Sequence, residues 1–276
     1  LGKVYRLKVY QIPEASRHAR GTAIVNLLPL EKGETIAAVI ATKDFPEDEY
    51  LMFATSQGMV KKTSMALYNR TRRDGLIAIN LKDGDKLISV KRVQPGDMVV
   101  IAANTGKAIK WDESEVRAMG RGTMGVHGIS LPVGAEALGL EIAREDSELL
   151  VITEKGYGKR TPIEEYPTQH RGGQGVFTIN MTAKKGMLAD VKVVNPGDEI
   201  IIMSEDGLTV RTPVSGISQQ GRSTQGVHIM NVADEDRVSV IAISKRAKKR
   251  VHKNELGQEE IEADGKDEMS EEDLDD

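Results

Sequence analysis

Residues 98–111 read MVVIAANTGKAIKW, an unbroken apolar run followed by a glycine turn and a second, mixed run. A short continuous apolar run is consistent with a strand that is buried on both faces. Asn104 and Gly106, between the two runs, are residue types that tight turns favour. The stretch therefore predicts two adjacent strands joined by a short turn.

The same pattern recurs about every fifty residues. LMFATSQG (51–58), LLVITEKG (149–156) and IIIMSEDG (200–207) also open with an apolar run and close on a glycine. One glycine series therefore runs through Gly2, Gly58, Gly106, Gly156 and Gly207. A second series runs through Gly21, Gly75, Gly125, Gly175 and Gly226, each followed five residues later by Asn26, Asn80, Ser130, Asn180 and Asn231. Such periodicity indicates a repeat protein.

Each repeat is interpreted as four short strands. In the repeat that begins with MVVIAA, the later strands are GVHGISL (125–131) and ALGLEI (137–142). YRLKVYQ (5–11) alternates apolar and polar residues, which predicts a half-solvated strand. Four strands every fifty residues predict an all-β, propeller-like disc of four-stranded blades. A linear β-solenoid is the alternative, because repetition alone does not establish ring closure.

Five repeats are visible, and the first is incomplete. Their approximate boundaries are 1–43, 44–94, 95–144, 145–195 and 196–244, followed by a tail at 245–276. The chain starts at the turn of the first repeat, so we expect a preceding segment of a longer protein to supply the opening strand of that repeat.

Composition excludes several classes of protein. The sequence has no cysteine, which excludes disulfides and thiolate metal sites and fits a reducing cytosol. It has no run of eighteen apolar residues that would predict a membrane span. Residues 1–244 carry 31 bases and 30 acids, so bulk charge does not indicate nucleic-acid binding.

The tail has two charge blocks. Residues 245–254 carry six bases and no acid, whereas 255–276 carry twelve acids and one lysine. Charge blocks of this kind are typical of disordered tails. A further hypothesis is that the acidic block folds back and competes with DNA for a basic edge of the disc.

Basic residues recur at fixed places in the repeat. The positions four residues before the second glycine series are Arg17, Thr71, Arg121, Arg171 and Arg222, and Arg70, Arg72 and Arg73 flank the threonine. The positions four residues after the first glycine series are Arg6, Lys62, Lys110, Arg160 and Arg211. Equivalent positions in a ring of blades lie along one edge, so the repeat predicts a discontinuous basic belt.

Such a belt suits a phosphate backbone that curves around the disc. Arginine binds phosphate through a planar fork of donors, and neighbouring glycines let backbone N–H groups approach. One or two phosphates per repeat would release roughly 5–10 counterions. Aromatic residues make up 4% of the chain, which favours duplex over stacked single strands.

The candidate DNA-binding residues combine the loops with the second strands. They are Arg6, Arg17, Arg20, Lys61, Lys62, Arg70, Arg72, Arg73, Lys110, Arg117, Arg121, Lys159, Arg160, Gln169, His170, Arg171, Gly172, Gly173, Gly175, Arg211 and Arg222. A single arginine beside a glycine is ordinary turn chemistry, and the hypothesis depends on recurrence in all five repeats. The rival hypothesis is a propeller that binds protein partners, whose binding would resist salt and heparin.

No catalytic or metal site is predicted. SEDG (204–207) faintly resembles an aspartate box, and Lys82 to Asp85 lacks the later ligands of a calcium loop, so both are interpreted as turns. The histidines His18, His127, His170, His228 and His252 are scattered over different repeats. We expect no cofactor, and no catalysis by this chain alone.

Four stretches resemble the C-terminal domain of the A subunit of bacterial DNA gyrase. They are YQIPEASRHARGTAIVNLLPL (10–30), VRAMGRGTMGVHGI (116–129), GYGKRTPIEEYPTQHRGG (156–173) and GRSTQGV (221–227), and the likeness extends over residues 1–244. The resemblance implies a β-pinwheel that wraps duplex DNA around its rim and supports negative supercoiling by an ATP-dependent type IIA topoisomerase. The C-terminal domain of the topoisomerase IV C subunit is a related, weaker match.

The resemblance also implies a location and partners. The chain is expected in the bacterial cytoplasm, associated with the nucleoid, and bound to the rest of the gyrase A subunit; through it the chain would reach the B subunit, which carries the ATPase. The family's signature box reads Gln, base, Arg, Gly, Gly, base, Gly. Residues 169–175 match it with His170 and Gln174 in place of two bases, so we interpret them as a degenerate copy and expect the true box outside this chain.

Overall fold

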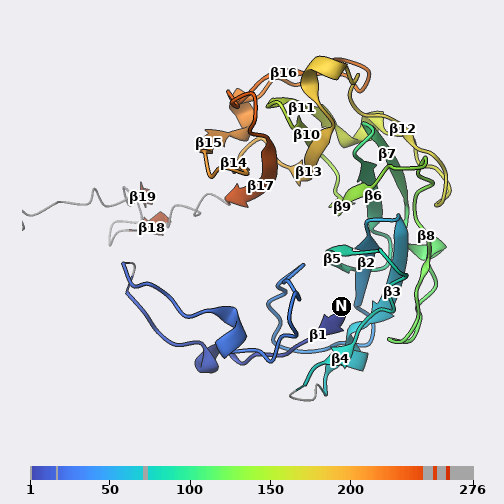
Figure 1. Ribbon diagram of the computed structural model, residues 1–276, viewed down its shortest axis with the longest axis vertical. Coiled ribbons are helices and arrows are strands. Elements are labelled where there is room, and N and C mark those ends of the chain that lie inside the picture. Colours follow the sequence, from blue (N-terminus) through green and yellow to red (C-terminus); the bar gives the residue numbers. More distant parts are fainter. Residues whose placement is uncertain (1, 17, 71–73, 245–250, 254–258, 262–276) are drawn as a thin grey trace, which may run out of the picture.

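The computed structural model describes residues 2–16, 18–70, 74–244, 251–253 and 259–261. Within these residues the chain consists of β-strands, irregular connections and short 3-10 turns. The sheets follow one another around an arc (Figure 1), which confirms the prediction of an all-β, propeller-like disc. No helix in this part of the chain is long and apolar enough to cross a lipid bilayer.

Three consecutive blades have four antiparallel strands each, named here from the inner edge of the arc outwards. The first contains β5 (Leu87–Val93), β2 (Tyr50–Thr55), β3 (Met59–Ser64) and β8 (Val126–His127). The second contains β9 (Ala137–Ala143), β6 (Met98–Ala103), β7 (Lys107–Asp112) and β12 (Val176–Phe177). The third contains β13 (Leu188–Val194), β10 (Glu148–Thr153), β11 (Tyr157–Pro162) and β16 (Val227–His228).

The sheets at the two ends of the arc are smaller. The last blade has the strands β17 (Val238–Ser244), β14 (Glu199–Ser204) and β15 (Thr209–Pro213). The first repeat contributes β1 (Lys3–Val4), which pairs with β4 (Leu76–Ile77). Within the tail, the described residues form the hairpin β18 (Val251–Lys253) and β19 (Glu259–Ile261). The expectations of a disordered tail and of an acidic block over the disc otherwise fall outside the described residues.

Short 3-10 turns punctuate the repeats. They are η1 (Val9–Gln11), η2 (Ile24–Asn26), η3 (Met65–Tyr68), η4 (Glu113–Glu115), η5 (Ile163–Glu165), η6 (Ala183–Lys185) and η7 (Val214–Gly216). The turns η3, η4, η5 and η7 each follow the second long strand of a repeat and redirect the chain into the arginine-bearing loop.

The outermost strand of each four-stranded blade comes from the following repeat. β8 belongs to the third repeat by sequence but pairs with β3 of the second, through Met59 opposite His127. β12 pairs with β7 and β16 with β11 in the same way. The prediction that the four strands of one repeat form one blade is therefore wrong for the outer strand, because a fifty-residue period is the same whether that strand folds back or crosses over. The crossing strand links each blade to the next.

The predicted strand over residues 5–11 is wrong. Only Lys3 and Val4 form a strand, and Val9–Gln11 form the turn η1. A strand persists only where a neighbouring strand satisfies its N–H and C=O groups. Among the described residues, no strand pairs with residues 5–11.

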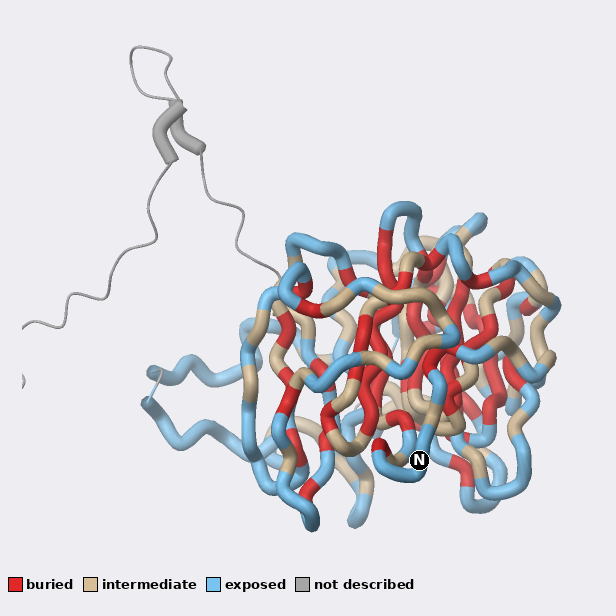
Figure 2. The backbone as a smooth tube through the Cα atoms, turned by 90° about the horizontal axis from the view of Figure 1, so that it is seen from above, coloured by how far each residue is buried: buried red, intermediate tan, exposed pale blue. Residues whose placement is uncertain are grey.

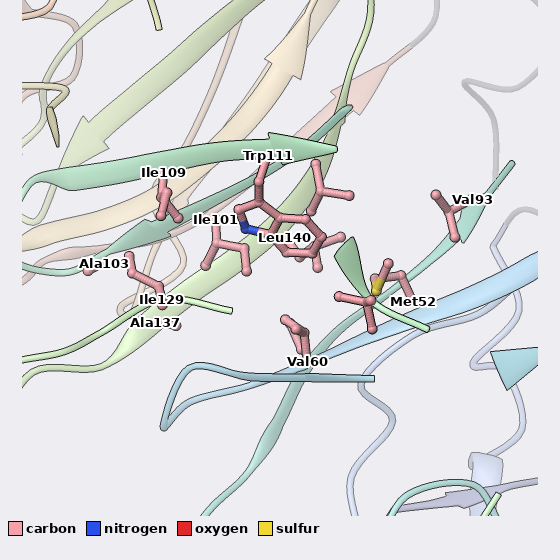
Figure 3. Close-up of a cluster of buried hydrophobic side chains, with 13 residues drawn as sticks. Met52, Val60, Val93, Ile101, Ala103, Ile109, Trp111, Ile129, Ala137 and Leu140 are labelled. Atoms are coloured by element: carbon pink, nitrogen blue, oxygen red, sulfur yellow. The ribbon is translucent and has the colours of Figure 1, made fainter. Parts of the chain in front are cut away.

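The hydrophobic core lies between blades rather than inside one sheet. Val99, Ile101 and Ala103 on one face of β6 pack with Met52 and other residues of the preceding blade, whereas alternate residues of β6 pack against the following one. Figure 3 shows the first of these junctions around Trp111. β6 is therefore buried on both faces, as its unbroken apolar run predicts. The buried residues follow the long strands, and the exposed ones gather in the connections (Figure 2).

The second glycine series is required where the outer strand meets its host. A Cβ on Gly125 would lie 2.2 Å from the carbonyl oxygen of Val60, and one on Gly175 would lie 2.4 Å from that of Ala108. Both residues also have positive φ, at 89° and 71°. L-residues with a side chain rarely adopt that conformation, so these positions demand glycine.

Candidate nucleic-acid interface

Three loops carry the recurring arginines to the outer edge of the arc. We define them as the arginine loops: residues 117–124, 168–174 and 219–225, which lead into β8, β12 and β16. These outer strands lie on the convex side of the arc, whereas β5, β9, β13 and β17 lie on the concave side (Figure 1). Arg121, Arg171 and Arg222 therefore follow one another along one edge.

Each arginine loop is tied to the preceding repeat by a backbone hydrogen bond. The donors are the backbone N–H groups of Asn80, Ser130 and Asn180, each of which stands five residues after a glycine of the second series. The acceptors are backbone carbonyl oxygens of the loops. The distances are 3.0 Å from Asn80 to Thr123, 2.9 Å from Ser130 to Gly173 and 2.9 Å from Asn180 to Thr224. The spacing between arginines is consequently set by the spacing between blades.

The guanidinium of Arg171 forms two hydrogen bonds that fix the position of this side chain. Its Nε donates to the carbonyl oxygen of Glu115 at 3.0 Å, and its Nη1 donates to that of His127 at 3.0 Å. The backbone N–H of Arg171 donates to the Glu115 carboxylate at 2.9 Å. This backbone hydrogen bond is the main cause that lowers the pKa of the Glu115 carboxyl. The loop is thus fixed at both the backbone and the side chain.

Arg222 sits in a similar place one blade further on. Its Nη1 approaches the carbonyl oxygen of Phe177 at 3.4 Å, and its guanidinium lies 5.9 Å from the centre of the Tyr166 ring. Beside it is an open cavity of about 470 Å³ whose lining includes Lys107, Phe177, Arg222 and Ser223. The Phe177 ring is 58% exposed there, with the Lys107 ammonium 5.3 Å from its centre. The cavity brings two cations and an exposed ring together between blades.

No carboxylate neutralises these three arginines within the described residues. Arg121, Arg171 and Arg222 are half-buried, and none of their guanidinium groups forms an ion pair in this part of the chain. Arg171 and Arg222 donate to carbonyl oxygens instead, which leave their positive charge uncompensated. An anion at the outer edge would meet two cations, Arg171 and Arg222, that are already oriented.

The bases on the second long strand do not form the exposed belt that the sequence predicted. Lys61 and Lys159 are fully buried, and Lys62 is buried in an ion pair with Glu113. Arg160 forms a two-pronged pair with Glu148, at 2.8 and 2.6 Å. The arginine loop of the next repeat runs beside these bases, with bridges from Lys62 to Ala118 and from Arg160 to Gln219, so the bases face the blade junction instead of solvent.

Two other bases of this series are less covered. Lys110 is half-buried, donates to the carbonyl oxygen of Ile163 at 3.0 Å, and has its pKa lowered by burial. Arg211 is exposed on β15, which has no outer strand over it among the described residues, and it pairs with Glu199. Although Arg211 is exposed, a carboxylate therefore neutralises it.

The remaining predicted residues divide into three groups. Arg6, Arg20, Arg70 and Arg117 are exposed, and Arg6 donates to the carbonyl oxygen of Asn69 at 2.6 Å. Arg17, Arg72 and Arg73 lie outside the described residues. The third group is the stretch that resembles the signature box, Gln169, His170, Gly172, Gly173 and Gly175.

The stretch 169–175 builds one arginine loop. The N–H of Gln169 donates to the carbonyl oxygen of Lys110, and that of Gly172 to the carbonyl oxygen of Gly128, both at 2.8 Å. His170 is 97% exposed, and its Nδ1 lies 2.7 Å from the Glu115 carboxylate. His170 is therefore placed at the surface next to Arg171.

Sequence reasoning missed residues that hold the loops or line the cavity. Glu115 and Glu165 each contact the backbone N–H of the arginine in the next repeat, at 2.9 and 3.3 Å. Both glutamates stand ten residues before a glycine of the second series, so aligning acids as well as bases would have found them. Lys107 and Phe177 carry no such signal, because their neighbourhood exists only once the outer strand has crossed over. Among the described residues, no three acidic or histidine side chains are arranged to hold a metal ion.

The fold and the loops define a class of protein: a propeller-like disc of blades that exchange their outer strands and carry arginine loops along the convex edge. Within that class, the chain belongs to the family described as the DNA gyrase C-terminal domain, a beta-propeller, whose model matches residues 1–43, 49–94, 97–143, 147–195 and 198–245. The family resemblance seen in the sequence is thereby confirmed.

Known relatives and solved structures agree with the family. The chain is 44% identical over 237 residues to the DNA gyrase A subunit of Salmonella typhimurium, a match that covers 86% of the chain and 27% of that protein. It is 41% identical over 244 residues to the corresponding protein of Staphylococcus epidermidis, covering 87% and 27%. The chain thus spans about a quarter of the length of these relatives.

Two solved structures share the fold. The crystal structure of the C-terminal domain of DNA topoisomerase IV superposes with a TM-score of 0.82 at 26% identity, covering 88% of this chain and 76% of that one. The structure of the DNA gyrase A C-terminal domain superposes with a TM-score of 0.76 at 27% identity, covering 88% and 79%. The chain therefore corresponds to part of the gyrase A protein.

Proposed function

We propose that this chain binds duplex DNA along the convex edge of the arc and bends it, in support of negative supercoiling by a type IIA topoisomerase. The observation that carries the proposal is the succession of Arg121, Arg171 and Arg222 along that edge. The guanidinium groups of Arg171 and Arg222 donate to carbonyl oxygens, and none of the three arginines has a carboxylate partner within the described residues. The chain is not a catalyst on its own in this proposal.

The physics of the proposed interface is that of phosphate contacts. An arginine fork matches two phosphate oxygens, and a charge-assisted hydrogen bond contributes roughly 1.5–3 kcal/mol. Bending a 20–30 bp duplex smoothly by 40–90° costs about 1–6 kcal/mol. Three arginine loops therefore supply enough free energy to offset the bend. Because contacts to phosphate carry no sequence information, binding is expected to be insensitive to sequence.

Curvature follows from the backbone ties between loops and blades. The three arginine loops are each hydrogen-bonded to the preceding repeat, and the repeats turn around the arc. A duplex that contacts all three loops must follow the same turn. The bend is then imposed by the protein fold rather than by DNA sequence.

Partners beyond DNA follow from family membership. We propose that the chain acts as a domain of the gyrase A protein in the bacterial cytoplasm, at the nucleoid, next to the rest of that polypeptide and to the ATPase-bearing gyrase B protein. The support is the identity of 41–44% to bacterial gyrase A proteins. A topoisomerase IV-type role is the second candidate, because the topoisomerase IV domain gives a TM-score of 0.82.

A topology assay tests the proposal and separates the two candidates. Nicked circular DNA is incubated with the chain and ligated, and the handedness of the trapped supercoils is read on gels. Positive supercoils support gyrase-like wrapping, and bending without trapped supercoils supports the topoisomerase IV-type role. Absence of duplex binding at low salt would overturn both.

Charge substitutions test the edge itself. Replacing Arg121, Arg171 and Arg222 with alanine should lower the salt slope of log affinity by about 3. The matched control replaces three exposed bases outside the arginine loops, Lys82, Lys86 and Arg144, with alanine and removes the same net charge. If both triple variants lose affinity equally, binding is non-specific attraction and the edge has no special role. Binding of a protein partner that resists heparin and salt would instead support the rival hypothesis of a protein-binding propeller.

A further inference from the structure

The second strands of two blades contain a buried lysine that the proposed function leaves unexplained. Lys61 in β3 and Lys159 in β11 stand three residues after Gly58 and Gly156, and both side chains are 0% exposed. Burying an ammonium is costly unless polar groups surround it. The equivalent position in the other repeats is Tyr5, Ile109 or Val210, so the blade fold does not require a lysine there.

Both ammonium groups reach the arginine loop of the next repeat. Lys159 Nζ donates to the carbonyl oxygens of Gly221 and of Arg222, the latter at 2.8 Å, and to Thr224 Oγ1 at 3.0 Å. Lys61 Nζ donates to the carbonyl oxygens of Ala78 and Arg121. The three donors of the Lys159 ammonium thus meet three acceptors, all of them on a single loop.

We propose that Lys61 and Lys159 are positioning residues that orient Arg121 and Arg222 for contact with phosphate. The inference rests on the proposed function and names side chains that never touch the DNA. Lys159 fixes the carbonyls of two consecutive residues, and these define the backbone dihedrals of Arg222. The direction in which the Arg222 side chain leaves the backbone is then fixed as well.

The loop of Arg171 supplies an internal contrast. Ile109 replaces the lysine there and packs beneath Gly173, where a Cβ would lie 3.3 Å from its Cδ1. Arg171 is instead held by carbonyl oxygens of Glu115 and His127 that bind its guanidinium directly. Arg171 thus has two acceptors at 3.0 Å around its guanidinium and no ammonium beneath its loop, whereas Arg222 has one acceptor at 3.4 Å and a buried ammonium beneath its loop.

The lysines are not replaceable by their neighbours in the sequence. Lys62 points to the Glu113 carboxylate and Arg160 to that of Glu148, so both are neutralised. The groups around Lys159 include Arg222, Glu165 and Lys185, from three different elements. Burial lowers the pKa of Lys61 and of Lys159 to about 8, so both are mostly charged at neutral pH.

A double-mutant cycle on duplex affinity tests the inference. Lys159→Met should weaken binding about tenfold and lower the salt slope by about 1, although Lys159 is buried. Arg222→Ala should have the same effect, and Lys159→Met/Arg222→Ala no further effect. Additive losses, or unchanged affinity in Lys159→Met, would overturn the inference.

Controls separate positioning from general stability. Ile109→Met changes an apolar residue at the equivalent position and should leave DNA affinity within about twofold, since the Arg171 loop has other supports. Peptide-level hydrogen exchange of Lys159→Met should rise in residues 219–225 and stay unchanged in 168–174. A rise spread evenly over both loops would mean a merely structural role and would overturn the inference.

Failure of folding leaves a second, independent test. If Lys159→Met does not melt cooperatively, the same cycle is run with Lys61→Met and Arg121→Ala at the other loop. Should the parent chain bind no duplex, the proposed function fails. Should the parent bind and lose affinity on removal of the three arginines while both lysine variants bind normally, only the positioning role fails.

Discussion

Replacing Glu113 with alanine leaves the Lys62 ammonium buried without its carboxylate. The two side chains are 9% and 5% exposed, so water reaches neither of them freely. Breaking a buried ion pair by removing one partner costs about 3–5 kcal/mol. Lys62 keeps the carbonyl oxygen of residue 113 at 3.2 Å and the Tyr50 ring at 5.2 Å, which favours the lower end, about 3 kcal/mol. The corresponding fall in Tm is about 6–12 °C.

The measurement is equilibrium urea unfolding followed by tryptophan fluorescence. Trp111 is the single tryptophan of the sequence and lies buried at the same blade junction, two residues before Glu113. Its emission therefore reports directly on the junction that the substitution weakens. The far-UV circular dichroism of the variant checks that the blades are still formed before denaturant is added.

Two variants make the Glu113 prediction refutable. Glu49→Ala breaks the more exposed pair with Arg92, whose side chain is 39% exposed, and should cost less than about 1 kcal/mol. Lys62→Met/Glu113→Leu replaces the buried pair with apolar side chains and should unfold within about 1 kcal/mol of the parent. A Glu113→Ala variant as stable as Glu49→Ala would show that the pair is hydrated, and the assignment of the second-strand bases to the blade junctions would fall with it.

Three further predictions concern the glycines and the buried ionisable groups. Gly125→Ala should destabilise by more than about 2 kcal/mol in urea unfolding, because its Cβ would meet a backbone carbonyl at 2.2 Å; Gly134→Ala, with positive φ but open space, should cost about 1 kcal/mol. Burial raises the pKa of Glu141, so the unfolding free energy of the parent should fall relative to that of Glu141→Gln as pH rises above 4.5. Parallel plots of unfolding free energy against pH for the two proteins would refute this. Burial lowers the pKa of Lys61 and Lys159 to about 8, so the unfolding free energy of the parent should rise between pH 8 and 10.5 relative to the double Met variant, and a fall would contradict it.

The repeat and its buried strands were predictable from sequence because their signals are local. The apolar run of β6 and the glycine that ends its turn are chemical requirements of the strand and of the turn themselves. The crossing of β8 to the preceding blade was not predictable. A strand of two residues carries almost no pairing information, and its host is chosen by the packing of whole blades.

The candidate site divides along the same line. The arginines of the loops were found because they repeat with the glycines, and the structure brings Arg171 and Arg222 to the equivalent place beside successive outer strands. Lys61 and Lys159 were assigned to the same edge because each stands next to a base of the series that recurs on the second strand. Their burial depends on an arginine loop from the next repeat, whose carbonyl oxygens accept hydrogen bonds from the two ammonium groups, and this contact is not visible in a one-dimensional pattern.

The crossing strand also explains why loops at the outer edge can impose a bend. Each arginine loop runs from the long strands of its own blade into an outer strand that pairs in the preceding blade, and a hydrogen bond such as that from Ser130 to Gly173 also attaches it to the preceding repeat. A loop attached to only one blade could swing to follow a straight duplex, at the cost of a few local dihedrals. A loop attached to two blades cannot move without opening the junction between them, where residues such as Trp111 and Leu140 are fully buried. The free energy that resists straightening is therefore that of the hydrophobic core, and it is available at every junction along the arc.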